Sequence, residues 1–481
     1  MRAIDAFAIG TLQTPGYELM RRAAAASLTE LQRRWPAARR LLVLCGGGNN
    51  AGDGYVLARL AAAAGLNARI GAVSEPAALR GDAARAFADW QSSGGATLPW
   101  RDALAEAPDV VVDALLGIGA SRDLDGEFAA AVALLNDSWR PVLALDIPSG
   151  LQADSGAVLG VCVRADCTVT FIAHKAGLWL ANGPDHCGDL VVADLALEQW
   201  PDDLGEPVVS ASDPAEVSAV LPARARGANK GRFGHVLIVG GGPGMSGAAR
   251  LCAEAALRVG AGLVSVATAP EHAAQLAAVM PELMVSAVAS AADLMPLLQR
   301  ADVVAIGPGL GQSAWARGIW SCAMAGGLPL IVDADALNLL AAHPEQRDDW
   351  VLTPHPGEAG RLLGIPTATV QSDRLAAASA LRDRYGGTVV LKGAGSLVAS
   401  AAGVHICLHG NPGMAAAGMG DVLTGVIAGI QGQVRDLAVA ARIGVLVHAL
   451  AGDHAAHHGQ RGMIASDVIA ELRGCVNPIA R

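Results

Sequence analysis

The stretch NPGMAAAGMGDVLTG, residues 411–425, joins a glycine-rich turn to one carboxylate and an apolar helix. Gly413, Gly418 and Gly420 let a ligand approach the backbone closely, and a helix beginning near Asp421 would point free N–H groups at the same place. The pattern therefore predicts a cradle for a phosphate group. Because a carboxylate repels phosphate, we expect Asp421 to act as a base on a hydroxyl group that attacks the phosphorus. An aspartate that only caps a helix is the alternative.

Short apolar runs alternate with alanine-rich segments along both halves of the chain. Each run ends at a glycine or an acidic residue, which is typical of parallel strands covered by helices on both faces. The segment 198–223 breaks this rhythm and collects prolines and aspartates, so we expect two α/β domains, 1–212 and 213–481. The predicted strands are 41–45, 110–113, 141–146, 168–172 and 191–195 in the first half, then 235–240, 263–268, 303–306, 328–333, 350–353 and 388–392 in the second.

Composition restricts the class of protein. A chain of 481 residues is longer than one core usually fills. An apolar share of 52% with only 4% aromatics and 58 glycines fits alanine- and valine-rich α/β layers joined by glycine turns. A net charge of -10 argues against nucleic-acid or anionic-membrane partners. Anionic ligands must then be held locally, for example by helix N-termini.

Three features predict a soluble, cytoplasmic protein. The eight cysteines include no CxxC pair, which favours buried free thiols in a reducing compartment. The N-terminus lacks the sustained apolar core of a signal peptide. The most apolar late segment, 443–452, is interrupted by His448 and is shorter than a membrane span.

The first half contains the strand, glycine turn and helix pattern LLVLCGGGNNAGDGYVLARLAAA, residues 41–63. Gly46, Gly48 and Ala51 satisfy G-x-G-x-x-[G/A], but no acidic residue closes the next expected strand, near residues 69–73, to bind a ribose. Asn49, Asn50 and Asp53 exceed what a phosphate turn needs, and their oxygens suit a hard cation as well. A conventional dinucleotide-binding turn with solvated asparagines is the alternative.

Polar side chains also follow later strands of this half. Asp113, Asp146 and Ser149 stand at strand ends, and Lys175 follows a further strand. Ligands of open parallel sheets bind at the carboxyl ends of the strands, so an acid and an amine could flank one substrate there. Taken singly, each could be a turn or surface residue.

These four segments, 48–54, 113–119, 146–150 and 171–177, resemble the YjeF N-terminal domain, the NAD(P)HX epimerase family. The resemblance spans roughly residues 1–200 and implies a Rossmann-like three-layer αβα domain. It implies that Asn50, Asp113 and Ser149 hold K⁺, and that Asp146 and Lys175 act around the hydrated C6 carbon of the nicotinamide. It further implies that the substrate is bound by Asn49, Asn50, Ala51, Gly52, Asp53, Gly117, Ile118, Gly119, Ala120, Ser121, Arg122, Asp123 and Asp146.

Three positions depart from this family's usual pattern. Ala51 replaces a glycine, Ile118 replaces a threonine, and His174 and Ala176 stand where the family has a proline near the site lysine. Ala51 adds only a methyl group. Ile118 removes a hydroxyl group that could touch phosphate.

The second half lacks the G-x-x-x-x-G-K-[ST] lysine of a P-loop, although Gly242, Gly244 and Gly247 offer another glycine turn. His355 lies between prolines, where a structural turn residue is the ordinary interpretation. Residues 392–396, KGAGS, form a turn with a cation and a hydroxyl group, and a plain hairpin connection is the alternative there.

Together with GMGD at 418–421, these motifs resemble the YjeF C-terminal domain, the ADP-dependent NAD(P)HX dehydratase family, which has a ribokinase-like αβα fold. The resemblance spans about residues 221–475; Ala416 and Ala417 depart from it but leave GMGD intact. It implies ADP as phosphoryl donor, with Mg²⁺ neutralising its phosphates. The hydrated nucleotide would contact Ala248, Gly309, His355 and Asp421, and the adenine nucleotide would contact Lys392, Gly393, Ala394, Gly395, Ser396 and Gly420.

The two resemblances together imply a bifunctional enzyme that repairs NADHX and NADPHX. Closed assemblies are common among cytosolic enzymes of this kind, so we expect a homo-oligomer. Two other hypotheses stay open at this point. A ribokinase-like kinase of a small hydroxylated metabolite would prefer ATP and release a stable phosphorylated product. Alternatively, the first half could bind a ligand or a partner without catalysing a reaction.

Overall fold

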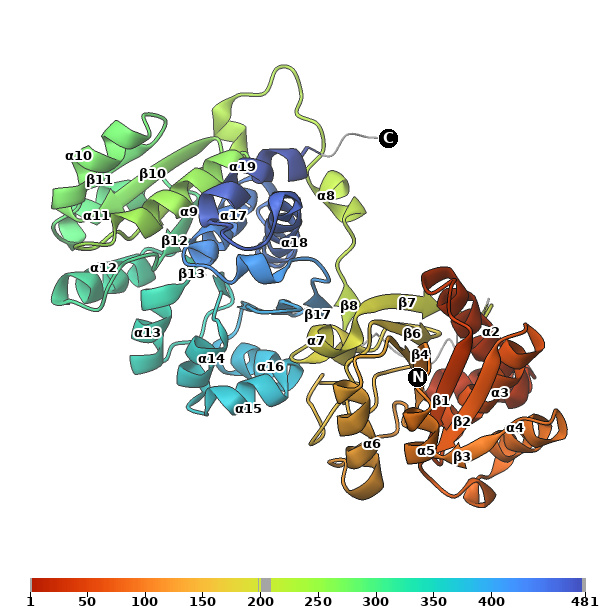
Figure 1. Ribbon diagram of the computed structural model, residues 1–481. Helices are drawn as coiled ribbons and strands as arrows, with labels where there is room; N and C mark the ends of the chain where they lie inside the picture. The colour runs from red at the N-terminus through yellow and green to blue at the C-terminus, as the bar shows by residue number, and fades with distance from the viewer. Residues whose placement is uncertain (1, 198, 200–208, 478–481) are drawn as a thin grey trace. The chain divides into compact units, whose positions relative to one another are not determined.

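The computed structural model describes residues 2–197, 199 and 209–477. Residue contacts divide the chain into two units, Met1–Pro207 and Val208–Arg481, each with its own sheet and core. Most of the acidic, proline-rich part of the predicted linker, residues 198 and 200–208, lies outside the described residues. Figure 1 shows that each unit is built from a sheet between helices, so the predicted α/β class is confirmed.

The first unit contains a parallel sheet of seven strands in the order β3-β2-β1-β4-β5-β6-β7. The five strands expected here are present, although the last begins at Asp189 and ends at Ala193. The strand expected near residues 69–73 is present as Asn67–Ala72, whereas Thr97–Pro99 was not predicted. The sheet comprises β1 (Arg40–Cys45), β2 (Asn67–Ala72), β3 (Thr97–Pro99), β4 (Val110–Ala114), β5 (Val142–Leu145), β6 (Cys167–Phe171) and β7 (Asp189–Ala193).

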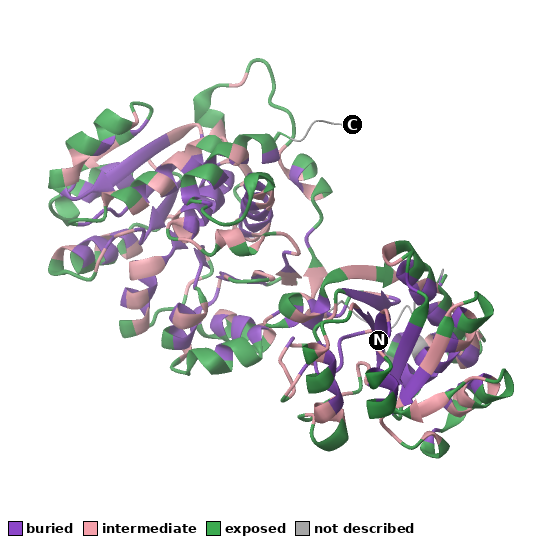
Figure 2. Cartoon of the chain, viewed as in Figure 1, coloured by how far each residue is buried: buried purple, intermediate pink, exposed green. Residues whose placement is uncertain are grey.

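Helices cover both faces of this sheet because neighbouring residues of a strand point to opposite sides. Leu41, Val43 and Cys45 pack in one core with α2, α3 and α4, whereas Leu42 and Leu44 pack in another with α5 and α6. Purple strands between half-exposed helices mark these cores in Figure 2. The helices are α1 (Arg2–Gly10), α2 (Gly16–Arg34), α3 (Asn49–Ala63), α4 (Gly81–Ser92), α5 (Trp100–Ala105), α6 (Gly126–Asp137) and α7 (Gly183–Cys187), with 3₁₀ turns η1 (Pro76–Ala78) and η2 (Ala176–Leu178).

The second unit contains a sheet of ten strands in the order β11-β10-β9-β12-β13-β14-β15-β16-β17-β8. All six predicted strands are present, but the parallel rhythm ends at β15, because β15, β16 and β17 pair antiparallel. Residues 392–396 are thus the turn of a hairpin. The strands are β8 (Ser210–Ala211), β9 (His235–Val239), β10 (Leu263–Thr268), β11 (Met284–Ala287), β12 (Val303–Ile306), β13 (Leu330–Val332), β14 (Trp350–Leu352), β15 (Thr388–Leu391), β16 (Leu397–Ser400) and β17 (Gly403–Ile406).

Helices α9, α17, α18 and α19 share one core on one face of this sheet, while α16 packs on β15 and β16 from the other. Gly425 and Gly429 of α17 let the helix lie against the backbone of α9, where a Cβ would meet Cys252 O and Ala256 O. The helices are α8 (Ala215–Val220), α9 (Ser246–Arg258), α10 (Pro270–Val279), α11 (Ala291–Leu298), α12 (Ala314–Ala325), α13 (Ala334–Ala342), α14 (Pro356–Leu363), α15 (Thr367–Ser372), α16 (Arg374–Tyr385), α17 (Met419–Val434), α18 (Leu437–Ala455) and α19 (Ala465–Cys475), with η3 (Lys230–Phe233), η4 (Pro412–Met414) and η5 (Ala456–His458).

Helix α18 is longer than the segment 443–452 suggested. With η5 it forms a run of 22 residues, Leu437–His458, whose length and hydropathy would suffice to cross a membrane. The expectation that this segment is too short is therefore wrong. In the fold, 61% of its most apolar window is buried, and its residues belong to the shared core. These are the properties of a core helix.

The cysteines behave as the sequence predicts. All eight are free thiols, and seven are buried, with Cys322 half-buried. Burial raises the pKa of each thiol above its ordinary value.

Candidate active sites

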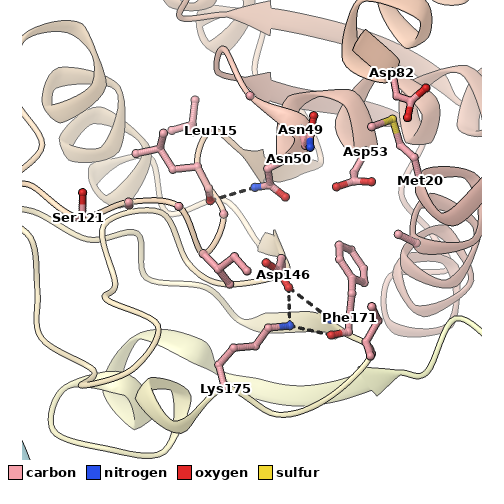
Figure 3. Close-up of a pocket in the computed structure, with 18 of the residues that line it drawn as sticks. Met20, Asn49, Asn50, Asp53, Asp82, Leu115, Ser121, Asp146, Phe171 and Lys175 are labelled. Carbon is pink, nitrogen blue, oxygen red and sulfur yellow. Dashed lines mark hydrogen bonds and ion pairs between the residues drawn. The ribbon is translucent and has the colours of Figure 1, made fainter. Parts of the chain in front are cut away.

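A cavity of about 630 Å³ lies at the carboxyl ends of the strands of the first unit (Figure 3). Its walls come from the start of α3, from the loop that follows β4, and from the ends of β5 and β6. The sequence-predicted residues that line it are Asn49, Asn50, Asp53, Asp146, Lys175 and the whole loop Gly117, Ile118, Gly119, Ala120, Ser121, Arg122 and Asp123.

Asp146 and Lys175 meet at one wall of this cavity. Lys175 Nζ lies 2.6 Å from Asp146 Oδ1, and it also donates to Thr170 Oγ1 and to the backbone oxygen of Phe171. Only 5% of Lys175 is exposed, so these three acceptors fix the ammonium group. Asp146 has a φ of 66°, a left-handed conformation that costs energy outside glycine and that occurs at functional sites.

The other carboxylate oxygen of Asp146 is available to a ligand. Oδ2 accepts no hydrogen bond within the described chain, and it faces Gly117, where a Cβ would stand 3.4 Å away. The arrangement thus places a fixed cation and a reachable carboxylate oxygen side by side, as proton transfer to and from a bound molecule requires.

Asn50 and Ser149 converge on the backbone of Leu116. Asn50 Nδ2 donates to Leu116 O, and Ser149 Oγ accepts from Leu116 N. The amide oxygen of Asn50 is buried and has no partner in the described chain. A buried acceptor without a donor is costly, and a cation is one group that would satisfy it.

Asp113 lies beneath this pair and does not line the cavity. Its carboxylate accepts from Ser149 N, from Ser149 Oγ at 2.6 Å and from Leu115 N. Burial raises the pKa of Asp113 to about 6, although these hydrogen bonds oppose that shift. The contacts show that Asp113 orients Ser149, in addition to any role toward an ion.

The second unit has a smaller cavity of about 390 Å³ at the start of α17. Helix α17 begins after Gly418, whose φ is 87°, and no side chain caps its first N–H groups. Asp421 thus does not serve as the helix cap, which removes the alternative considered from the sequence. The cavity is lined by Asp333, Ala334, His355, Pro356, Glu358, Lys392, Gly393, Gly418, Gly420 and Asp421.

The carboxylate of Asp421 makes no hydrogen bond with a described residue. Its pKa is raised to about 7, chiefly by burial and then by the charge of Asp333, while Lys392 opposes the shift. A carboxylate with this pKa is a stronger base than an ordinary aspartate and is still substantially ionised at neutral pH.

Lys392 is held between two acids. Its Nζ lies 2.7 Å from Asp333 Oδ1 and 3.9 Å from Glu358 Oε2. Burial alone would lower the pKa of Lys392, but these carboxylates outweigh it and the pKa is raised. Thr424 of α17 donates to the other oxygen of Asp333, so the helix and the lysine share one buried carboxylate. Gly420 fits against them, since a Cβ there would lie 3.2 Å from Lys392 Nζ.

His355 has a structural role that can be seen directly. Its Nδ1 accepts from Gly357 N at the start of α14, and Glu358 Oε2 accepts from His355 N. These two hydrogen bonds complete a capping box. Burial and the charge of Lys392 lower the pKa of His355, so the ring is neutral at pH 7. The ring still lines the cavity, with Nε2 3.4 Å from Glu358 Oε1.

Comparison with known proteins agrees with this division. A model of "NAD(P)H-hydrate dehydratase" matches residues 236–473, and a model of "YjeF-related protein N-terminus" matches residues 16–177. The bifunctional NAD(P)H-hydrate repair enzyme Nnr of Coxiella burnetii is 48% identical over 433 residues, 89% of this chain and 88% of its own length. The enzyme of the same name from Escherichia coli is 44% identical over 418 residues, 87% of this chain and 81% of its own.

The chain belongs to the family of bifunctional NAD(P)H-hydrate repair enzymes.

Members of this family combine an epimerase domain with an NAD(P)H-hydrate dehydratase domain, and the two units described here are those domains. Solved structures support the ribokinase-like fold of the second. An ADP/ATP-dependent NAD(P)H-hydrate dehydratase of Bacillus subtilis, crystallised with ATP and Mg²⁺, is 27% identical with a TM-score of 0.51, over 56% of this chain and 97% of its own. A ribokinase-like protein of Enterococcus faecalis is 30% identical with a TM-score of 0.53, over 58% and 98%.

Not every residue expected at the family's sites reaches a cavity. Ala51 and Gly52 point into the fold, where a Cβ on Gly52 would meet Met20 at 2.5 Å. Ala248 and Gly309 lie against each other but line neither cavity, and Ala394, Gly395 and Ser396 form the outer part of the 392–396 turn.

Several residues of the sites were missed from the sequence. Asp333 and Glu358 line the second cavity, and Arg374 lies beneath the 392–396 turn. A signal existed for Glu358, which follows His355 by three residues as in a capping box. No comparable signal exists for Arg374, because its partners are backbone carbonyls far along the chain.

Proposed function

We propose that the first unit interconverts the R and S epimers of NADHX and NADPHX, and that the second unit dehydrates the S epimer with ADP as phosphoryl donor, releasing AMP and phosphate. The observation that carries the proposal is Asp421: a carboxylate without a hydrogen bond in the described chain, with a pKa near neutrality, beside the uncapped start of α17. The family membership supports the choice of substrate.

In the second unit, Asp421 would take the proton of the C6 hydroxyl group as its oxygen attacks the β-phosphorus of ADP. Hydroxide is a poor leaving group at neutral pH and phosphate is a good one, so elimination then restores the dihydropyridine ring. The free N–H groups of Met419, Gly420 and Asp421 at the start of α17 would hold the transferred group, and Lys392 would offset its charge.

Mg²⁺ fits this cavity by its charge. Three carboxylates, from Asp333, Glu358 and Asp421, line it beside a single lysine, and a polyphosphate would add more negative charge. Glu358 and Asp421 have oxygens that could hold the ion, which would neutralise the phosphates when bound.

In the first unit, Asp146 and Lys175 would act around the hydrated C6 carbon. Asp146 Oδ2 can exchange a proton with the hydroxyl oxygen at C6, while the ammonium group of Lys175 holds Asp146 in place and offsets its charge. K⁺ would be held by the amide oxygen of Asn50 together with Ser149, with Asp113 behind them, and it would help bind the anionic substrate.

The proposed reaction is tested by following the absorbance of reduced nicotinamide in a mixture of NADHX epimers with Mg²⁺ and either ADP or ATP. We expect complete recovery of NADH with ADP. In Asp146→Asn, recovery should stop once the S epimer is used up, apart from slow spontaneous exchange. No recovery with either nucleotide would refute the proposal and favour a small-metabolite kinase.

We also propose that the chain works in the cytoplasm as a homo-oligomer on free small molecules, without nucleic-acid or membrane partners. Its net charge of -10 supports the absence of polyanionic partners. Light scattering on the purified protein would give the oligomeric state, and a monomer at micromolar concentration would refute that part.

A further inference from the structure

A single arginine lies beneath the turn proposed to bind the adenine nucleotide. Arg374 is the first residue of α16, and only 1% of it is exposed. Its Nη2 lies 3.2 Å from Leu391 O, 3.3 Å from Lys392 O and 3.4 Å from Gly395 O. One guanidinium group therefore gathers three carbonyl groups of one hairpin turn.

The turn is shaped around this guanidinium group. Gly393 has a φ of 142°, and a Cβ at that position would stand 2.3 Å from Arg374 Nη1. Because this atom belongs to a side chain held on several sides, a substituted residue 393 would have to displace the arginine. Gly393 is thus required by the arginine as well as by its backbone conformation.

Arg374 fixes the turn through carbonyl groups whose peptide N–H groups are partly used elsewhere: Lys392 N donates to Pro354 O, and Gly393 N donates to Ser396 Oγ. Gly393 O accepts from Ser396 Oγ, and because the C=O and N–H of one peptide unit point in opposite directions, this directs the N–H of Ala394 away from Ser396. The N–H groups of Ala394 and Gly395 donate to no acceptor within the described chain, and the turn is open to solvent there. Outward N–H groups without a partner are what an anion-binding loop presents.

The positive charge of Arg374 is not neutralised inside the protein. No carboxylate of the described chain lies within ion-pair distance, and the polar side chain that it meets is the amide of Gln371. Burial lowers the pKa of Arg374 to about 10, which still leaves it charged at pH 7. Its Nε has no partner in the described chain either. A buried charge without a counter-ion is costly and needs a reason.

We propose that Arg374 is a positioning residue for the phosphoryl donor: its guanidinium group fixes the 392–396 turn, in which the N–H groups of Ala394 and Gly395 are open to a ligand, and its charge offsets the phosphates of a bound nucleoside diphosphate or triphosphate. The proposal rests on the nucleotide role assigned to this turn above. A purely structural arginine would join α16 to the hairpin without affecting phosphate binding.

The test measures binding of AMP, ADP and ATP by calorimetry to the full-length wild type, Arg374→Gln and Arg374→Lys. We expect Arg374→Gln to weaken ADP binding about 10-fold or more, because carbonyls are released and a charge is lost. The loss should be smaller for AMP and larger for ATP. Arg374→Lys keeps the charge but cannot reach three carbonyls, so it should recover only part of the affinity.

Steady-state kinetics separates the roles further. The KM for ADP should rise in Arg374→Gln, while the KM for NADHX and the rate of epimer exchange change less than about twofold. Arg347→Gln is the matched control, since Arg347 also donates to backbone carbonyls, those of Met324 and Leu328, away from the turn. It should leave ADP binding unchanged.

Three results would overturn the inference: unchanged ADP affinity in folded Arg374→Gln, equal weakening of AMP, ADP and ATP, or full recovery of affinity in a variant without charge such as Arg374→Met. If Arg374→Gln fails to fold, Arg374→Lys decides, because unchanged ADP affinity there would show that the carbonyl contacts do not matter. If the wild type binds ADP but restores no NADH, the proposed function fails, and the binding series still decides the role of Arg374.

Discussion

Asp421 binds its proton near neutral pH, and this property should control the pH dependence of the second unit. The base form is needed, and it is lost as pH falls through a pKa of about 7. We therefore expect kcat/KM for dehydration to reach a plateau above pH 8 and to fall ~10-fold per pH unit well below 7. Asp421→Asn should lose about 100-fold or more on the plateau above pH 8, and its profile should lack this acidic limb.

A neighbouring carboxylate offers a sharper test of the same base. Asp335 raises the pKa of Asp421 through its charge, and Asn at this position could still accept from Gly311 N as Asp335 does. Asp335→Asn should shift the acidic limb of the pH profile to lower pH. Glu345→Gln, at an exposed position, is the control and should leave the limb in place. If the acidic limb does not move in Asp335→Asn, a group other than Asp421 controls the pH dependence.

The buried ion pair between Lys175 and Asp146 should support epimer exchange but not dehydration. Lys175→Met leaves Asp146 without its cation, so we expect a loss of about 3 kcal/mol in the free energy of unfolding and at least ~100-fold in epimer exchange. Dehydration of pure S-NADHX should be unaffected. Thr170→Val removes one of the three acceptors of Lys175 and should cause a smaller loss. Equal epimer exchange in wild type and Lys175→Met would exclude the lysine from the chemistry.

At the scale of elements, the start of α17 depends on Gly418. Alanine there would need a φ of 87° and would bring a Cβ within 2.7 Å of Leu251 Cδ1. We expect Gly418→Ala to cost about 1–3 kcal/mol in stability and to weaken nucleotide binding. Gly474→Ala in α19, where the space is open, should stabilise by up to ~1 kcal/mol. Chemical denaturation of both variants measures the contrast, and equal effects would contradict it.

Elements also show what the sequence can and cannot predict. Every predicted strand is present, because a buried parallel strand is a continuous apolar run. Thr97–Pro99 was missed because it is only three residues long. The hairpin after β15 was considered only as an alternative for residues 392–396, because the direction of the following strands is set by the pairing of β15, β16 and β17.

The residues of the candidate sites also differ in how far the sequence predicts them. Asp146, Lys175 and Asp421 were recognised because each follows a strand or a glycine turn in the sequence. Arg374 escaped notice because it acts on carbonyls of residues 391–395, about twenty positions away, and nothing in an arginine at a helix start reveals such partners. Local signals mark residues that face a ligand, whereas the groups that support them are revealed only by packing.

At the scale of the molecule, the two units have separate sheets and separate cores. We expect scanning calorimetry to resolve two transitions. ADP with Mg²⁺ should raise one of them, by up to about 2.7 kcal/mol of stability at 100 times its Kd, and leave the other in place. Gly418→Ala should lower the same transition that ADP raises. A single cooperative transition shifted as a whole by ADP would contradict independent units.

The placement of the cysteines has a consequence for the conditions in which the protein can operate. A thiol reacts with peroxides and disulfides as its thiolate, and all eight thiols here are held in the protonated form, seven of them out of contact with solvent. Neither proposed mechanism uses sulfur. An enzyme that restores damaged redox cofactors thus has no cysteine among the residues that line the two described cavities, and it should keep working through an oxidative episode that would inactivate a thiol-dependent enzyme.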